Sequence, residues 1–166
     1  NEFSDFARMP KPTFKKTNLN RIISDSLKLL TTNEEKIKVI FNCKGTVFIT
    51  ADSEQISRLF INLIKNSVES MNEKYQNNYD FIKKIIIEIN EINDYIEIFI
   101  IDNGIGFNIK TIAEIAKPYY TTKKNGTGLG LSIVVKIVND HNGTIEFLKF
   151  NKGAKIKITF PKLNAS

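Results

Sequence analysis

The sequence predicts an α+β fold, a two-layer α/β sandwich in which three helices cover one face of a mixed, mostly antiparallel sheet of about five strands. Two observations predict it. Apolar residues recur at helical spacing in three separate segments, and short apolar or alternating runs lie in pairs between these segments. Helices and strands that do not strictly alternate favour this architecture. The 166 residues, of which 42% are hydrophobic, fit one domain.

The first part of the chain is predicted to be a linker followed by a helix and two strands. Residues 1–12 are expected to be the end of a helix and a short connector, since Pro10 and Pro12 stop a helix and stiffen the chain. An amphipathic helix is expected from Thr17, with Thr17 or Asn18 as its N-cap. Two short strands follow, at 37–42 and 47–49.

The middle of the chain is predicted to be a long helix and a hairpin. Asp52 followed by Gln55 resembles a capping box, and the apolar spacing beyond it predicts a helix to about Met71. Two apolar runs, 84–92 and 95–102, flank a two-residue turn. They predict an antiparallel hairpin in the core.

The last part of the chain is predicted to be a helix and a second hairpin. The helix is expected from about Gly128 to Asp140, and Gly143 follows it in the manner of a glycine stop. The strands 144–150 and 155–160 then complete the sheet.

Composition limits the classes of protein to which the chain can belong. No run approaches the roughly 18 uninterrupted apolar residues of a membrane span, and the start lacks the layout of a signal peptide. The single cysteine, Cys43, cannot form an internal disulfide, which fits a cytoplasmic protein. Because the chain starts at Asn1 and not at methionine, we expect a piece of a longer protein, with the domain at 13–163 and a tail at 164–166.

The net charge of +6 and the pI near 9.3 would suit nucleic acid or a membrane surface. The lysines are spread in pairs along the chain, and they form no basic stripe interleaved with aromatic residues. We therefore expect no nucleic-acid partner.

Three polar residues, Asn62, Asn66 and Glu69, share one face of the long predicted helix, at positions i, i+4 and i+7. Amide oxygens can coordinate a hard cation such as Mg²⁺, which prefers oxygen ligands and is often shared with substrate phosphates. The alternative is an ordinary exposed helix face.

The segment IIDNGIGF, residues 100–107, places Asp102 directly at the end of a buried strand. A carboxylate there can accept a hydrogen bond from an exocyclic amine such as that of adenine. Gly104 and Gly106 would let the backbone approach a flat ring. The alternative is a tight turn, since Asp, Asn and Gly are common turn residues.

The segment TTKKNGTGLGLS, residues 121–132, places three alternating glycines before an apolar helix. The unpaired N–H groups and the dipole at the start of that helix favour an anion such as a phosphate chain, and Lys123 could add a positive charge. The segment is neither a P-loop nor a dinucleotide fingerprint, and its alternative interpretation is a mobile connector. ATP is the simplest ligand that would use all three groups of residues.

The order of these motifs resembles the ATP-binding domain of sensor histidine kinases, in the superfamily shared with gyrase B, Hsp90 and MutL. The matching segments are NLIKNSVES (62–70), DNGIG (102–106), PYYTTK (118–123) and GTGLGL (126–131). The resemblance covers nearly the whole chain and implies the Bergerat, or histidine kinase ATPase, fold. The start, FSDFARMPKP, resembles the end of the dimerisation helix in NtrY-like nitrogen-regulation sensors.

The resemblance implies that Asn66 coordinates Mg²⁺, that Asn62 lies near the phosphates and that Asp102 binds the adenine amine. Many such kinases carry a phosphate-binding lysine where this chain has Glu69, so Lys123 becomes the better candidate for that contact. The implied ATP-binding residues are Asn62, Asn66, Glu69, Asp102, Gly104, Gly106, Thr122, Lys123, Gly126, Thr127, Gly128, Leu129, Gly130 and Leu131.

The resemblance favours a kinase over an ATPase. ATPases of the superfamily carry a glutamate as general base where this chain has Asn62, and an amide cannot take the proton of water. The γ-phosphate is then kept for a histidine on a dimerisation domain. His141, the only histidine of the sequence, is expected to be structural, so the acceptor lies outside this chain.

The resemblance also implies partners: the dimerisation domain of the same kinase, a response regulator, and a homodimeric parent that could be anchored in the inner membrane. Three alternatives remain open at this point. They are a serine or protein kinase of the same superfamily, a non-catalytic nucleotide-binding docking domain, and a nucleic-acid-binding module.

Overall fold

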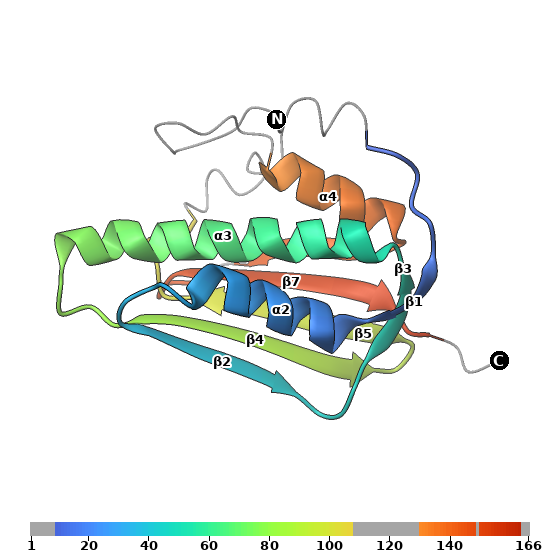
Figure 1. Cartoon of the computed structure of the whole chain (residues 1–166), viewed down its shortest axis with the longest axis horizontal. Coiled ribbons are helices and arrows are strands. Elements are labelled where there is room, and N and C mark those ends of the chain that lie inside the picture. The colour runs from blue at the N-terminus through green and yellow to red at the C-terminus, as the bar shows by residue number, and fades with distance from the viewer. Residues whose placement is uncertain (1–8, 108–129, 149, 164–166) are drawn as a thin grey trace.

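The computed structural model describes residues 9–107, 130–148 and 150–163. Within them, three helices lie on one face of a five-stranded sheet (Figure 1). The helices are α2 (Leu19–Thr31), α3 (Ser53–Asn77) and α4 (Gly130–Asp140). The strands, in spatial order, are β2 (Ile37–Cys43), β4 (Lys83–Ile92), β5 (Tyr95–Asp102), β7 (Ala154–Pro161) and β6 (Thr144–Leu148).

The strand pairing confirms the predicted fold class. β2 runs parallel to β4, and the other neighbouring strands of this sheet pair antiparallel. The sheet is therefore mixed and mostly antiparallel, with the helices as the second layer.

Three features differ from the sequence-based expectation. A two-stranded sheet of β1 (Lys15–Asn18) and β3 (Phe48–Ala51) was not predicted, because the four residues KKTN of β1 carry no apolar pattern. The helix α3 continues to Asn77, past the predicted end at Met71, because its last turns are polar and the apolar spacing could not reveal them.

The third difference is the stop of α4. The left-handed residue is Asn142, with φ of 59°, and not Gly143. The N–H of Asn142 donates to the Asn139 carbonyl and that of Gly143 to the Val138 carbonyl, which is a Schellman motif. Gly143 is needed for a different reason, since a Cβ there would lie 2.9 Å from the Phe160 ring.

Two helix starts carry the caps that the sequence predicts. The Asn18 side chain accepts from the Arg21 N–H at 3.0 Å and caps α2. The Asp52 carboxylate accepts from the N–H groups of Glu54 and Gln55, both at 3.1 Å, and caps α3.

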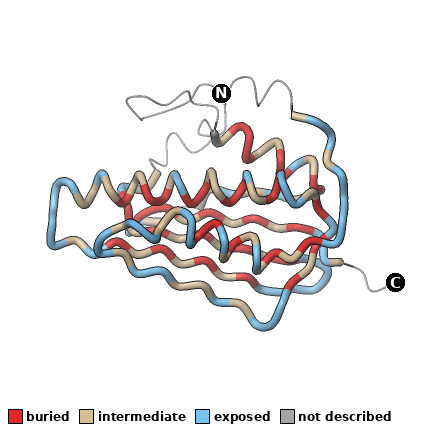
Figure 2. Tube along the Cα trace, in the orientation of Figure 1, coloured by how far each residue is buried: buried red, intermediate tan, exposed pale blue. Residues whose placement is uncertain are grey.

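The core lies between the helices and the inward face of the sheet (Figure 2). Side chains alternate across each strand, so one row of β5 points to the helices: Ile96, Ile98 and Ile100, all buried. The next inward position in this row is Asp102. The strand thus carries a carboxylate into the edge of the apolar core.

The segment before β1 is tied to the start of α3. The Gln55 side-chain amide donates to the Pro10 carbonyl at 2.9 Å, and the Thr13 N–H donates to the Asp52 carboxylate at 2.9 Å. The domain boundary at residue 13 stays a prediction, since contacts lie on both sides of it. The predicted helix end in residues 1–8 and the tail at 164–166 lie outside the described residues.

Candidate functional site

Asp102 ends β5, the central strand of the sheet, between Ile85 of β4 and Ala154 of β7. The residue is only 3% exposed. Its Oδ1 atom accepts from the N–H of Gly104 at 2.9 Å and from that of Ala154 at 3.4 Å. The carboxylate is therefore held in a fixed orientation by backbone groups of two different segments.

Burial raises the pKa of the Asp102 carboxyl above its ordinary value. Hydrogen bonds from the Ser67 hydroxyl and from the two backbone groups act in the opposite direction, as does the charge of Lys74, and burial has the larger effect. Within the described part of the chain, no cation forms an ion pair with this carboxylate. Asp102 is thus a buried acceptor supported by dipoles.

The turn after Asp102 packs directly on α3. A Cβ atom on Gly104 would collide with the Ser70 side chain and would lie 2.9 Å from the Met71 backbone nitrogen. The Ile105 N–H donates to the Ser70 hydroxyl at 2.9 Å, and the Lys74 ammonium donates to the Asn103 carbonyl at 3.1 Å. The helix therefore fixes the position of the turn.

The turn between β6 and β7 touches the same residues from another side. Gly106 has φ of 76°, and a Cβ there would lie 2.5 Å from the Gly153 carbonyl oxygen. A Cβ on Gly153 would collide with the Asp102 carbonyl oxygen. Close packing within the protein thus accounts for the glycines at 104, 106 and 153, and an approach of a flat ring to the first two stays a prediction.

The predicted polar face of α3 lies beside this turn. Asn62, Asn66 and Glu69 are half-buried on one helix. Ser67, which follows Asn66 directly, hydrogen-bonds the Asp102 carboxyl. The fold therefore brings the amide of Asn66 and the carboxylate of Asp102 into the same neighbourhood, although they are far apart in the sequence.

The helix α4 runs antiparallel to α3 and packs on it (Figure 1). At one end, the Asp52 N–H before α3 donates to Nε2 of His141 after α4, at 3.0 Å. The 11 residues of α4 span about 16 Å at 1.5 Å per residue. The first turn of α4, at Gly130 and Leu131, therefore lies beside the part of α3 near Asn62.

His141 has a structural position. It is 3% exposed, its Nδ1–H donates to the Ile137 carbonyl at 2.7 Å, and its Nε2 accepts from Asp52. The edge of its ring contacts Phe14. Both ring nitrogens are used inside the fold, which fits the expectation that His141 is not a phosphoacceptor.

The remaining predicted site residues lie outside the described part of the chain. They are Thr122, Lys123, Gly126, Thr127, Gly128 and Leu129, together with the PYYTTK segment. Their roles stay predictions. Gly130 opens α4, and Leu131 packs its side chain against the core.

Sequence reasoning missed the residues that support Asp102: Ser67, Ser70, Lys74, Gly153 and Ala154. One of them left a readable signal. Ser67 lies four residues after Leu63 and four before Met71 on the buried side of α3, so it is a small polar residue at an apolar position. The others depend on contacts between segments distant in the sequence.

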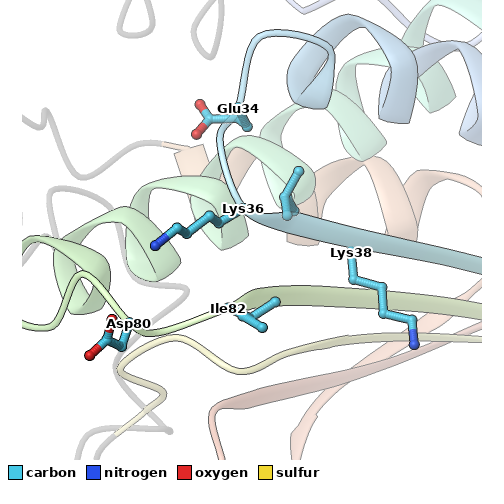
Figure 3. Close-up of a pocket in the computed structure, with 6 residues that line it drawn as sticks. Glu34, Lys36, Lys38, Asp80 and Ile82 are labelled. Atoms are coloured by element: carbon cyan, nitrogen blue, oxygen red, sulfur yellow. The ribbon is translucent and has the colours of Figure 1, made fainter.

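An open hollow of about 410 Å³ lies elsewhere, and none of the predicted site residues lines it (Figure 3). Its charged side chains point in different directions and form no converging set (Figure 3). The lining residues are Glu34, Lys36, Ile37, Lys38, Asp80 and Ile82. The described residues also hold no cluster of three His, Cys, Asp or Glu side chains suited to a metal, and none of their helices could cross a membrane.

Comparisons with known proteins show the family of the chain. Residues 51–164 match the family described as histidine kinase-, DNA gyrase B-, and HSP90-like ATPases. The chain is 33% identical over 166 residues to an NtrY-like sensor histidine kinase of Rickettsia typhi, covering 96% of this chain and 26% of the relative. It is 33% identical over 162 residues to the nitrogen regulation protein NtrY of Azorhizobium caulinodans, covering 95% and 21%.

Among solved structures, the catalytic domain of the histidine kinase ThkA superposes with a TM-score of 0.78 at 27% identity, covering 90% of this chain and 98% of that one. The chain spans about a quarter of the length of the curated relatives. It belongs to the family of histidine kinase-, DNA gyrase B- and HSP90-like ATPases, and it is similar to the catalytic domains of sensor histidine kinases.

Proposed function

We propose that this domain binds Mg-ATP between α3, the end of β5 and the start of α4. We further propose that in its parent protein it donates the γ-phosphate to a histidine of the dimerisation domain. One observation carries the proposal: a buried carboxylate, Asp102, has no ion-pair partner within the described residues and lies against the helix that carries Asn66.

Asp102 is suited to an exocyclic amine. The carboxylate accepts two backbone N–H groups and the Ser67 hydroxyl, and since a carboxylate can accept about four hydrogen bonds, one acceptor position remains for a ligand. Adenine offers an amine at the position where guanine offers a carbonyl oxygen. A carboxylate therefore favours ATP over GTP.

The phosphates are assigned to the other two groups of residues. Asn66 would hold Mg²⁺ through its amide oxygen, since hard cations prefer oxygen ligands, and Asn62 would lie near the phosphates. When bound, Mg²⁺ neutralises part of the phosphate charge. The backbone amides at 128–131 would face the phosphate chain, and Thr122, Lys123, Gly126 and Thr127 would cover it.

Asn62 favours transfer to histidine over hydrolysis. Its amide cannot accept a proton from water, so the γ-phosphate is not consumed by a fast side reaction. In the transfer, an imidazole nitrogen of the acceptor forms a bond to the γ-phosphorus while the bond to the β-phosphate oxygen breaks. ADP leaves, and the ring, which is now positively charged, loses the proton of its other nitrogen to solvent. A response regulator would then accept the phosphoryl group, and the parent would act as a homodimer.

Calorimetry with Mg-ATP tests the nucleotide site. We expect Asp102→Asn to weaken ATP binding by about 10- to 100-fold, because a hydrogen bond to a charged group contributes about 1.5–3 kcal/mol. Asp94→Asn is the matched control, since Asp94 is exposed in the turn between β4 and β5. Absence of ATP binding by the unaltered chain, or equal binding by Asp102→Asn, would contradict the proposal.

A second experiment tests the transfer. The chain is incubated with radiolabelled Mg-ATP and the dimerisation domain of its parent protein, supplied separately. We expect an acid-labile label on that domain, and none when its histidine is replaced. An acid-stable label would indicate a serine kinase. Binding of ATP without any transfer would indicate a docking domain.

A further inference from the structure

The turn that follows Asp102 is held by one hydroxyl group of α3. The Ser70 Oγ atom accepts the Ile105 N–H at 2.9 Å. Gly104 lies so close that an added Cβ would collide with Ser70 Oγ and lie 2.8 Å from the Ser70 carbonyl carbon. The distance between the turn and the helix is therefore set by the side chain at position 70.

A short path joins this contact to the carboxylate. Gly104 precedes Ile105, and its own N–H donates to Asp102 Oδ1 at 2.9 Å. A shift of the Ile105 amide must therefore move the group that orients Asp102. On the same helix, Ser67 lies one turn before Ser70 and is 4% exposed. Two hydroxyl groups of α3 thus face the acceptor and its turn.

The contact between Ser70 and Ile105 contributes little to overall stability. Ile105 is 53% exposed, so water can reach its N–H when the hydroxyl is removed. Serine is also a poorer helix former than alanine, which partly offsets the lost hydrogen bond. A hydroxyl at this position is therefore better explained by the geometry of the turn than by the stability of the fold.

We propose that Ser70 is a positioning residue that holds the Asp102 carboxylate at the place where it meets the exocyclic amine of adenine, and so contributes to the choice of ATP over GTP. The inference rests on the proposed nucleotide site. Ser70 acts through Ile105 and Gly104 and needs no contact with the ligand.

The test compares Ser70→Ala with Ser57→Ala, a serine of the same helix that is far from the turn. The dissociation constants for Mg-ATP and Mg-GTP and the melting temperature are measured for both variants. For Ser70→Ala we expect ATP binding to weaken about three- to tenfold, the size of one hydrogen bond, with GTP binding unchanged. The melting temperature should stay close to that of Ser57→Ala, which should bind both nucleotides as the unaltered chain does.

Two further measurements sharpen the test. Ser70→Cys keeps the size of the side chain but offers a weak acceptor, so it should fold and show part of the loss. Amide hydrogen exchange at Gly104 and Ile105 should be faster in Ser70→Ala and unchanged in Ser57→Ala.

Three outcomes would overturn the inference while the nucleotide site stands: an unchanged ATP-to-GTP ratio in Ser70→Ala, a parallel loss of both affinities together with a lower melting temperature, or unchanged exchange at the two amides. Failure of the unaltered chain to bind ATP would instead overturn the proposed function itself.

Discussion

Lys83 and Asp102 are both buried charged residues at the same end of the sheet, where β4 starts and β5 ends, and their surroundings differ. The Lys83 ammonium donates to the Glu34 carboxylate at 2.9 Å and to the Asn72 amide oxygen at 2.8 Å. It also lies 5.0 Å from the centre of the Tyr75 ring. Asp102 has backbone N–H groups and a hydroxyl around it, but no ion pair within the described residues.

The difference separates a charge that is satisfied within the fold from one that we propose to meet a ligand. The desolvation of Lys83 is offset by a charge, an amide and an aromatic face within the fold, so no ligand is required. The burial of the Asp102 carboxylate is not offset by an ion pair, and its pKa is therefore raised. The carboxylate can still accept a hydrogen bond from a ligand. A buried charge left without an ion pair is a candidate for ligand binding. The predictions below test this contrast.

The largest effect is expected at Lys83. Lys83→Ala leaves the Glu34 carboxylate and the Asn72 oxygen without their shared donor and opens a cavity beside Tyr75. We expect a loss of about 3–5 kcal/mol in the free energy of unfolding, measured by urea denaturation. Lys38→Ala, at an exposed lysine, should change it little. A loss below about 1 kcal/mol would show that the contacts of Lys83 do not stabilise the fold, and Lys83 could then not be contrasted with Asp102.

A smaller loss is expected at Asp52, a half-buried counterpart of Asp102. Partial burial opposes the shift, but backbone hydrogen bonds from Thr13, Gln55 and Glu54 lower the pKa of the Asp52 carboxyl below 3.8. Its contribution is therefore complete at neutral pH and is lost as the pH falls through the lowered pKa. Asp52→Ala should cost about 1 kcal/mol at pH 7, by chemical denaturation. The same cost persisting in acid, after the Asp52 carboxyl is protonated, would contradict this.

The contribution of Asp102 to stability should depend on pH in the opposite direction from that of Asp52. Because its pKa is raised in the folded state, its contribution to stability falls as the pH rises from the ordinary value through the raised one. Asp102→Asn removes this cost. We expect a gain in the free energy of unfolding at pH 7 that is smaller than the loss in Asp52→Ala, because the new amide adds N–H groups to satisfy. A loss of stability in this variant would show that the carboxylate supports the fold.

The smallest effect is expected at an exposed ion pair. The Lys162 ammonium lies 3.0 Å from the Glu91 carboxylate, with side chains 42% and 47% exposed. Solvent screens this pair, so Lys162→Ala should cost less than about 0.5 kcal/mol, measured by thermal denaturation in low salt. A loss comparable to that at Lys83 would show that burial is not what distinguishes the two lysines.

Local patterns were sufficient to predict most of the fold. The N-cap residue Asp52 and the alternating runs around Asn93 predict the start of α3 and the central hairpin, and both are confirmed. The reciprocal bond of a capping box is not formed, since the Asp52 N–H donates to His141 and not to Gln55. β1 and the far end of α3 escaped prediction because polar residues form them, and only tertiary contacts decide their state. At the end of α4, Asn142 has the left-handed conformation that the glycine stop led us to expect at Gly143.

The sequence was sufficient to predict the carboxylate of the candidate site, but not the residues that hold it in position. A carboxylate at the end of an apolar run is visible in the sequence, and the row of inward isoleucines before Asp102 explains its burial. The contact between Ser70 and Ile105 joins residues 35 positions apart. No local pattern reports such a contact, because it exists only when β5 ends beside α3.

The packing of Gly153 against the Asp102 carbonyl has a consequence for mutational scanning of this protein. A substitution at 153 would push on the strand end that carries Asp102, the acceptor that we propose, and we expect nucleotide affinity to fall. Sensitivity to mutation will therefore extend from the nucleotide-facing surface into the turn between β6 and β7. A map of sensitive positions will therefore include residues that hold Asp102 in place as well as residues that contact the nucleotide.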